Sequence, residues 1–557
     1  MNILEDKTLA HSLKRVKHET SQESEALGED EIVSSTVPSK YRGTATDRED
    51  MRTLGKKQVL RRNFKFVTML GFASTVICTW EFLLAYDHGP SFIVHHLSHH
   101  SPSPRLISIV LLNGGPGTLF WGFIVCTIGM SLVYASMAEM ASMAPTAGGQ
   151  YHWVSEFAPP SIQKPLSYLV GWLCATGWQV FLAGVAFIVG TIIQGLIVLN
   201  DEKYEFKAWH GTLLAIAVIS FSIIFNTSLA TRLPLIEGIV LIIHMTGLFV
   251  VIIPMWVLGP RANARDILFT FSNNAGWPST GLSTMIGLTS PFGCLLGYDC
   301  SVHMAEEIKD ASSTLPKAIM WSLGLNAAMG FIMATTFVFT MGDVTSLLES
   351  PTGYPFIQAF YNSTRSLALT NLMTAIIIIC CISCCISEVA TASRQIWSFA
   401  RDGGLPFSGF LSQVTPGWNI PLRAVLVSLC VSALLACINI GSTTALYAIN
   451  SLGGVSVISS YFITIACVLH KRLRGEPLPR RRWTLGKYGV AVNIGALLFL
   501  IPLWFFLFWP VYTPVTLQTM NWAAVMYTAI VVVAVAYYLI KGRHTYTSPV
   551  TLTKRDI

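Results

Sequence analysis

The chain has 557 residues, of which 52% are apolar and only 12% are charged, and its formal net charge is +7. A soluble domain carries about 25% charged residues, so this composition excludes an ordinary soluble protein and, with the long apolar runs, predicts an integral membrane protein. The positive charge does not indicate nucleic-acid binding, because the Lys and Arg residues flank the apolar runs and therefore indicate topology.

The N-terminal residues 1–65 are polar and contain few aromatic side chains, so we predict a disordered tail. The tail opens without the apolar core of a signal peptide and ends in a basic cluster at 56–65. Lys7, Lys14 and Lys17 lie among several Ser and Thr residues. They are expected targets of modification, which gives ubiquitin or the trafficking machinery as a partner of the tail.

Apolar runs long enough to cross a bilayer, at about 20 residues each, follow the tail. We predict twelve spans, at 66–86, 116–138, 166–197, 210–230, 234–258, 281–304, 317–341, 367–393, 421–440, 443–470, 487–509 and 520–541.

The distribution of Lys and Arg predicts the orientation. Cytoplasmic loops are rich in these residues, which places the basic N-terminal cluster, Arg394, Arg401 and the loop 471–482 inside. We therefore expect a membrane domain at 66–541 with both termini cytoplasmic, and a short C-terminal tail at 542–557. The plasma membrane is the expected location, and the vacuolar membrane is the alternative with the same orientation.

Two glycosylation sequons bear on this topology. Asn362 opens a sequon between the seventh and eighth spans, on the expected outer side, so we predict that it is glycosylated. Asn226 opens a second sequon inside the fourth span, and we predict that it is unused.

The twelve cysteines all fall inside apolar runs, and four of them cluster at 380–385. In a soluble loop such a cluster would suggest metal or redox chemistry. Within a membrane span, and without a neighbouring His or Asp, we expect small apolar packing instead, with no disulfide framework and no metal site.

The sixth run is interrupted by residues that do not suit a continuous membrane helix. Pro291, Gly293 and Gly297 precede Tyr298 and Asp299. A broken membrane helix is tolerated only where it is buried in protein or lines a cavity, and an ionisable residue at that depth suggests a functional site. We predict that this stretch forms half of a substrate site.

Five motifs, in order along the chain, carry a family resemblance. They lie at 71–81 (GFA to WE), 113–116 (NGGP), 138–153 (AEMASMAPTAGGQYHW), 297–307 (GYD to HMAEE) and 393–406 (SR to FARDGGLP). Together they resemble the amino acid–polyamine–organocation superfamily, and within it the fungal amino acid/choline permeases that include the GABA-permease-like proteins. The resemblance spans about residues 60–550.

The resemblance implies a fold and an activity. The fold would be all-α with twelve transmembrane helices, as two inverted five-helix repeats plus two extra helices, with helices 1 and 6 broken around a central substrate. The activity would be secondary active import of an amino acid or a related amine such as GABA, coupled to protons, by alternating access. The proton gradient would be the driving force, with no cofactor, and the partners would be the small-molecule substrate and the lipid bilayer.

Small residues in the first span are candidate substrate contacts. Gly71, Ala73, Ser74 and Thr75 could form an unwound backbone that binds the substrate carboxylate. The alternative is close helix–helix packing by small residues. The residue count does not decide where between residues 71 and 78 the unwound centre lies.

Three carboxylates within the spans are candidates for substrate binding or proton coupling. Glu81 could bind the substrate amine or a proton, or make a structural hydrogen bond to a neighbouring helix. Asp299, next to Gly297 and Tyr298, could contact an ammonium group, or cap the second half of the sixth span. Glu388 could carry coupling protons, or pair with Arg394 near the cytoplasmic surface.

Charged residues at the cytoplasmic span ends are expected to form inner-gate ion pairs, with solvated charges of little energetic weight as the alternative. These gate residues are Glu139, Glu306, Glu307, Arg394 and Arg401.

The loop at 87–112 is long and contains five histidines. A His-rich tract can bind metal, but no Cys and only Asp87 accompany it, so we favour a retained intron in the gene model over a metal site.

The same residues are compatible with other functions. Choline, a polyamine or a secondary-metabolite intermediate are alternative substrates, and Tyr298 and Trp80 could bind a quaternary ammonium by cation–π contact. A nutrient sensor with a transporter fold is a third hypothesis, which the short C-terminal tail disfavours. No nucleophile–base pair lies outside the spans, so we do not expect an enzyme.

Overall fold

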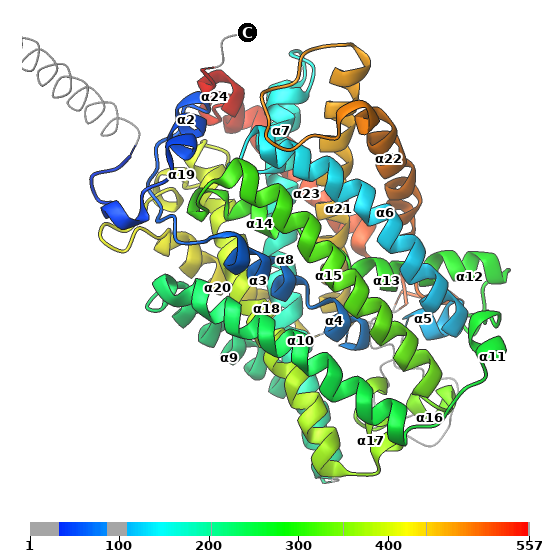
Figure 1. Ribbon diagram of the computed structural model, residues 1–557. Coiled ribbons are helices and arrows are strands. Elements are labelled where there is room, and N and C mark those ends of the chain that lie inside the picture. The colour runs from blue at the N-terminus through cyan, green and yellow to red at the C-terminus, as the bar shows by residue number, and fades with distance from the viewer. Residues whose placement is uncertain are drawn as a thin grey trace, which may run out of the picture.

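Helices account for nearly all of the regular structure. The computed structural model describes residues 33–85, 109–201, 203–348, 350–441, 443–517 and 519–554. Within those ranges it contains helices and isolated bridge pairs but no strand of a sheet (Figure 1). Eleven helices in this described part are long and apolar enough to cross a membrane. The predicted helical membrane protein is therefore confirmed.

The long uninterrupted helices make up the bundle. They are α6 (Gly115–Met143), α8 (Gln163–Asn200), α9 (Ala208–Asn226), α10 (Leu233–Leu258), α15 (Ala311–Thr340), α18 (Leu367–Arg401), α20 (Leu422–Gly441), α21 (Thr443–Leu473), α22 (Gly489–Phe506) and α23 (Ala523–Tyr537). Shorter helices lie between them or at the ends of the bundle. These are α2 (Ala45–Thr53), α5 (Ile109–Leu112), α7 (Gln150–Phe157), α11 (Ala264–Leu268), α16 (Val344–Leu348), α17 (Pro355–Thr364), α19 (Ser408–Leu411) and α24 (Arg543–Thr545).

The first span is broken at a single residue. Helix α3 (Phe66–Ile77) ends at Cys78, which has a left-handed φ of 40°, and helix α4 (Thr79–Ala85) begins directly after it. A non-glycine residue in this region carries strain of about 1–3 kcal/mol, which persists only where the surroundings hold it. All seven residues of α4 are buried.

The sixth predicted span, at 281–304, is three short helices rather than one long one. They are α12 (Thr280–Gly287), α13 (Thr289–Gly293) and α14 (Cys300–His303). The backbone between α13 and α14 leaves the helical path, and Gly297 has a φ of 116°. Because none of the pieces reaches the length of a bilayer crossing, eleven span-length helices are found where we predicted twelve spans.

The two broken segments lie inside the bundle. Helix α3 packs against α10, α15 and α18, and α4 packs against α15. Helix α14 packs against α18 and α3, while α13 packs against α6. Buried apolar side chains from all of these helices form one continuous core, so both interruptions are enclosed by protein, as the sequence predicts for a broken membrane helix.

The predicted disorder of residues 1–65 is wrong for its second half. Residues 33–65 are ordered and include α2, which lies beside α24 at one end of the bundle, here called the tail end (Figure 1). The Asp47 carboxylate of α2 accepts hydrogen bonds from the backbone N–H groups of Asp310 (2.9 Å) and Ala311 (3.0 Å) at the start of α15. Residues 1–32, with Lys7, Lys14 and Lys17, lie outside the described part.

Buried basic residues fasten the same segment to the bundle. Arg62 pairs with Asp47 (3.2 Å) and donates to the carbonyl oxygens of Ala305 and Ile308. Lys56 pairs with Asp402 at the end of α18. Polar composition predicts disorder because it offers little apolar surface, but here the polar groups bind free backbone and charged groups of the bundle.

The loop at 87–112 falls mostly outside the described residues, and only its last four residues form α5. The interpretation of its histidines stays a prediction. The C-terminal tail, by contrast, packs on the tail end, where Tyr546 is buried against Tyr168 and Phe399.

Candidate substrate and coupling site

Tyr134 of α6 holds the interruption of the sixth segment. Its hydroxyl accepts hydrogen bonds from the backbone N–H groups of Gly297 (2.8 Å) and Tyr298 (3.3 Å) and donates to the carbonyl of Leu295 (3.1 Å). A Cβ at Gly297 would lie 3.0 Å from the Cδ1 of Ile77, so a larger residue would meet α3 as well as adopt a strained φ. One buried phenol therefore satisfies backbone groups that the break leaves free.

Asp299 follows the break and contacts side chains rather than capping a helix. It occupies the position before α14, yet its carboxylate makes no capping hydrogen bond, so the capping interpretation is wrong. Instead it accepts hydrogen bonds from Gln150 of α7 (2.6 Å) and from the Tyr461 hydroxyl of α21, and it lies 3.5 Å from His303 Nε2. The carboxylate thus joins α7, α14 and α21.

Aromatic rings surround this carboxylate. The Tyr134 ring centroid lies 5.0 Å from that of Tyr298 and 6.0 Å from that of Tyr461. The Tyr298 hydroxyl lies 3.1 Å from the Thr79 hydroxyl, just after the break of the first span. The two interruptions therefore meet through a direct hydrogen bond.

The structure places the break of the first span later than the small residues that we singled out. Gly71, Ala73, Ser74 and Thr75 all lie within the regular helix α3. A Cβ at Gly71 would lie 2.9 Å from the carbonyl oxygen of Glu237, so Gly71 permits close helix packing. A contact between these four residues and the substrate stays a prediction.

Glu81 makes a buried pair with His244 of α10. Its Oε1 lies 2.7 Å from His244 Nδ1, and His244 Nε2 lies 3.2 Å from Asn326 Oδ1 of α15. The Asn326 amide nitrogen donates to the carbonyl of Ser74 at 3.0 Å, which fixes Oδ1 as the acceptor toward His244. The ring therefore carries a proton on Nε2, and the short Nδ1–Oε1 contact requires a second proton shared by His244 and Glu81. Trp80 stacks on His244, with ring centroids 6.2 Å apart.

Glu237 of α10 is a buried carboxylate that sequence reasoning missed. It accepts hydrogen bonds from Thr75 of α3 (2.6 Å) and from Ser387 of α18 (2.6 Å). It thereby links the broken first span to two other helices. The sequence does show a carboxylate in the fifth apolar run. Because it lies only four residues into α10, it resembles a charged residue at the end of a span.

Glu388 does not pair with Arg394, which corrects that interpretation. Arg394 is bonded instead to Glu307. Glu388 is 4% exposed, and its Oε2 has no hydrogen-bond partner among the residues that the structure describes. With the pair to Arg394 excluded, proton coupling is the interpretation of Glu388 that stays a prediction.

Ion pairs cross the tail end of the bundle. The two terminal nitrogens of the Arg401 guanidinium, Nη1 and Nη2, each donate to Glu306 at 2.8 Å, and Arg394 Nε lies 2.7 Å from Glu307. Burial alone would raise the pKa of Glu306, but the Arg401 charge outweighs it and holds this pKa below its ordinary value.

Glu139 belongs to a separate part of this network. It pairs with Arg472 and with Arg481 (3.0 Å), which come from α21 and the loop after it, rather than with Arg394 or Arg401. The predicted gate residues thus form two groups, and their role in gating stays a prediction.

The two sequons differ in their surroundings. Asn362 lies in α17, at the end of the bundle opposite the tail end (Figure 1), and its Oδ1 accepts a hydrogen bond from Gln358. Asn226 is buried at the end of α9 and donates to the Ile386 carbonyl at 2.7 Å. Glycosylation at Asn362 stays a prediction.

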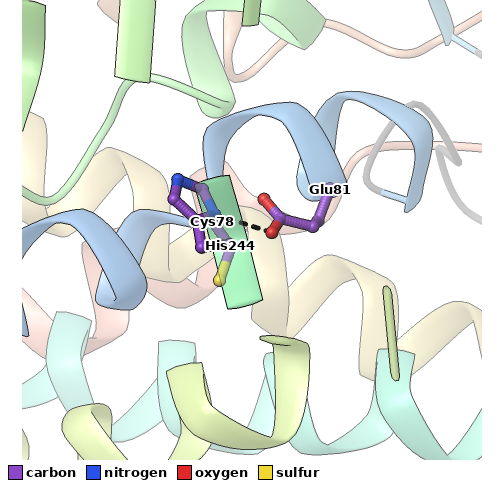
Figure 2. Close-up of side chains that lie close together, drawn as sticks. All are labelled: Cys78, Glu81 and His244. Atoms are coloured by element: carbon purple, nitrogen blue, oxygen red, sulfur yellow. Dashed lines mark hydrogen bonds and ion pairs between the residues drawn. The ribbon is translucent and has the colours of Figure 1, made fainter. Parts of the chain in front are cut away.

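A mixed group of potential metal ligands lies at the first break. Cys78, Glu81 and His244 each offer one ligand atom, and these atoms lie within 4.8 Å of one another. Figure 2 shows the three side chains converging from the α3–α4 junction and from α10. Sequence spacing could not predict the group, because His244 is more than 160 residues from the other two.

Comparisons with known proteins all match this chain to permeases and transporters. A family model described as amino acid permease matches residues 91–535. A Macrophomina phaseolina protein, named provisionally as an amino acid/polyamine transporter, is 30% identical over 461 residues, which cover 82% of this chain and 97% of that protein. The choline transporter of Saccharomyces cerevisiae is 27% identical over 78% of this chain and 77% of its own length. The amino-acid permease BAT1 of Arabidopsis thaliana is 27% identical over 79% of this chain and 87% of its own.

Proposed function

The chain belongs to the amino acid permease family and is a secondary transporter rather than an enzyme, and from this premise we propose that it carries an amino acid or a related amine by alternating access. Family membership confirms the resemblance predicted from the five motifs. The substrate class, the coupling ion and the site residues are proposals.

The meeting of two broken segments carries the proposal. Cys78 interrupts the first span, the backbone before Asp299 interrupts the sixth, and Thr79 and Tyr298 join them. Broken helices present free N–H groups and carbonyls, which suit the carboxylate and the ammonium of a zwitterion. The substrate would bind between these segments, with Asp299 facing its amine.

We propose protons as the coupling ion. The Glu81–His244 pair holds a shared proton in the geometry described above, and Glu237 of α10 accepts hydrogen bonds from α3, before the first break, and from α18. Asp299 and Glu388 are further candidates. A carboxylate that gains or loses a proton inside the bundle changes the charge that the bundle must bury, which couples protonation to conformation.

An uptake assay tests both proposals. The full chain in proteoliposomes is given labelled amino acids, GABA and choline at two external pH values, with and without a proton ionophore. We expect accumulation of at least one amino acid or amine, and a several-fold fall when the ionophore collapses the gradient. Uptake that does not change when the ionophore is added would overturn the proposal of proton coupling. If no amino acid or amine is taken up above the level of empty vesicles, the proposed substrate class is wrong.

A cationic amine without a carboxylate is the second candidate. The rings of Tyr134, Tyr298 and Tyr461 beside Asp299 would suit a quaternary ammonium by cation–π contact, and one relative is named as a choline transporter. In the same assay, choline would then compete with the labelled substrate, whereas a site that needs the carboxylate would not respond to choline.

The tail end is proposed to be cytoplasmic, because both described chain ends lie there (Figure 1) and the basic loop 471–482 is joined to the start of α15 there by Arg482 and Asp310. The plasma membrane is the proposed location, with the vacuolar membrane as the alternative.

A further inference from the structure

We propose that Cys78, Glu81 and His244 form a binding site for a thiophilic divalent cation such as Zn²⁺ or Cd²⁺, and that an ion bound there ties the first break to α10. Thiolate, imidazole and carboxylate are the three ligand types that Zn²⁺ takes in proteins. Their ligand atoms lie within 4.8 Å of one another, so side-chain shifts of about 1 Å would bring all three to the bond lengths of about 2.0–2.3 Å that Zn²⁺ makes with such ligands.

The hydrogen-bonding pattern around His244 prepares it as a ligand. Asn326 is fixed by its bond to the Ser74 carbonyl and so accepts from the Nε2 of His244. This leaves Nδ1, which shares a proton with Glu81 at 2.7 Å, as the nitrogen whose lone pair can bind an ion once that proton is lost. A metal-bound histidine is commonly held by a hydrogen bond from its other nitrogen in this way.

Glu81 also has a free ligand atom. Its side chain is fully buried, and its Oε2 accepts no hydrogen bond within the described structure. An unpaired carboxylate oxygen in such a place costs free energy, and a cation bound to Oε2 would lower that cost.

Further thiols border the three side chains. The Cys380 thiol lies next to Glu81, and the Cys384 thiol lies next to that of Cys78. The presence of several thiols around the site favours a soft metal over Mg²⁺ or Ca²⁺.

Binding would exchange protons for the ion. The thiol proton of Cys78 and the proton shared by Glu81 and His244 would be released to solvent as the ion binds. Bound metal would therefore increase with pH. It would also hold α4 against α10 and inhibit uptake, and this last consequence alone rests on the proposed transport function.

Direct metal binding tests the site without any transport assay. The purified full chain in detergent is dialysed against Cd²⁺, and bound metal is measured by elemental analysis. We expect about one ion per chain that Cys78→Ser removes. The serine hydroxyl can keep the bond that the Cys78 thiol makes to the Thr75 carbonyl, so the variant is expected to fold, which a melting curve checks.

Cys126→Ser is the matched control, because Cys126 is another buried thiol, on α6, away from the three side chains. It should bind as the unmodified chain does. Equal binding by Cys78→Ser and the unmodified chain, or no bound Cd²⁺ in the unmodified chain, would overturn the proposal. In vesicles, Cd²⁺ should inhibit uptake by the unmodified chain more than tenfold more strongly than uptake by Cys78→Ser. Loss of metal binding without this difference would overturn only the inhibitory role.

Discussion

At the scale of single residues, the buried carboxylates differ in whether a partner stabilises their charge. Asp299 has Gln150 and Tyr461 as donors, and Glu237 has Thr75 and Ser387. Glu388 has no such donor at Oε2 in the described structure. Substitutions at these positions should therefore have different consequences.

Asp299→Asn should lower uptake at least tenfold. The amide keeps the shape of the side chain but loses the charge that we propose to face the substrate amine, and a hydrogen bond to a charged group contributes about 1.5–3 kcal/mol. Initial rates of labelled substrate uptake, normalised to surface protein, measure the effect. Asp266→Asn, at an exposed position of α11, is the control and should transport normally. Full activity of Asp299→Asn would contradict the site assignment.

Glu388→Gln should leave the melting temperature unchanged or raise it. A buried carboxylate without a partner destabilises the fold, and a neutral amide reduces that cost by about 1–3 kcal/mol. The melting temperature in detergent measures this effect, with Glu307→Gln as a contrast, because that change breaks the pair with Arg394. A marked decrease for Glu388→Gln would mean that the carboxylate has a stabilising partner in solution.

At the scale of elements, the docking of α2 on the tail end depends on one carboxylate, that of Asp47. Asp47 binds the first free N–H groups of α15 and pairs with Arg62. Asp47→Ala should release residues 33–64 from the tail end, because it removes a helix cap and leaves Arg62 without its charge partner. Hydrogen exchange of α2 should become faster. Glu49→Ala is the control on the same helix, because its pair with Arg52 is exposed and should contribute little.

The same contact should depend on pH. Burial would raise the pKa of Asp47, but the charge of Arg62 and three backbone N–H groups outweigh it and hold the pKa below its ordinary value. A carboxylate whose pKa is lowered on docking stabilises the docked state above its free pKa of about 3.9, and the contribution disappears as pH falls through the lower value. Protection of α2, corrected for intrinsic exchange, should therefore decrease below about pH 4. In Asp47→Ala this acid-dependent loss should be smaller.

At the scale of the whole molecule, the sequence was sufficient for the bundle and for one of the two breaks. Apolar runs of bilayer length predict the helices, and Pro291 and Gly297 mark the sixth segment because such residues do not continue a helix. Cys78 gave no such mark, since a left-handed cysteine depends on its surroundings rather than on its own preference. The partners of Glu81 and Glu237 are distant in sequence, and only the packing of α10 brings them together.

The closure of the tail end should depend on the pairing of Arg401 with Glu306 rather than on either charge alone. The carboxylate is buried and bonded to two guanidinium nitrogens, and breaking a buried pair costs about 3–5 kcal/mol because one charge loses its partner. Glu306→Arg and Arg401→Glu should each abolish most uptake and lower the melting temperature.

Combining the two substitutions should restore part of both properties, because opposite charges face each other again. The restoration should be incomplete, since Glu306 also accepts a hydrogen bond from the backbone of Ala147. The control is the same reversal at Glu49 and Arg52, whose side chains are 59% and 61% exposed, where solvent screens the charges and neither single change should matter. A double variant no better than the worse single variant would show that the two charges act separately, and the tail-end ion pairs would then not act as a gate.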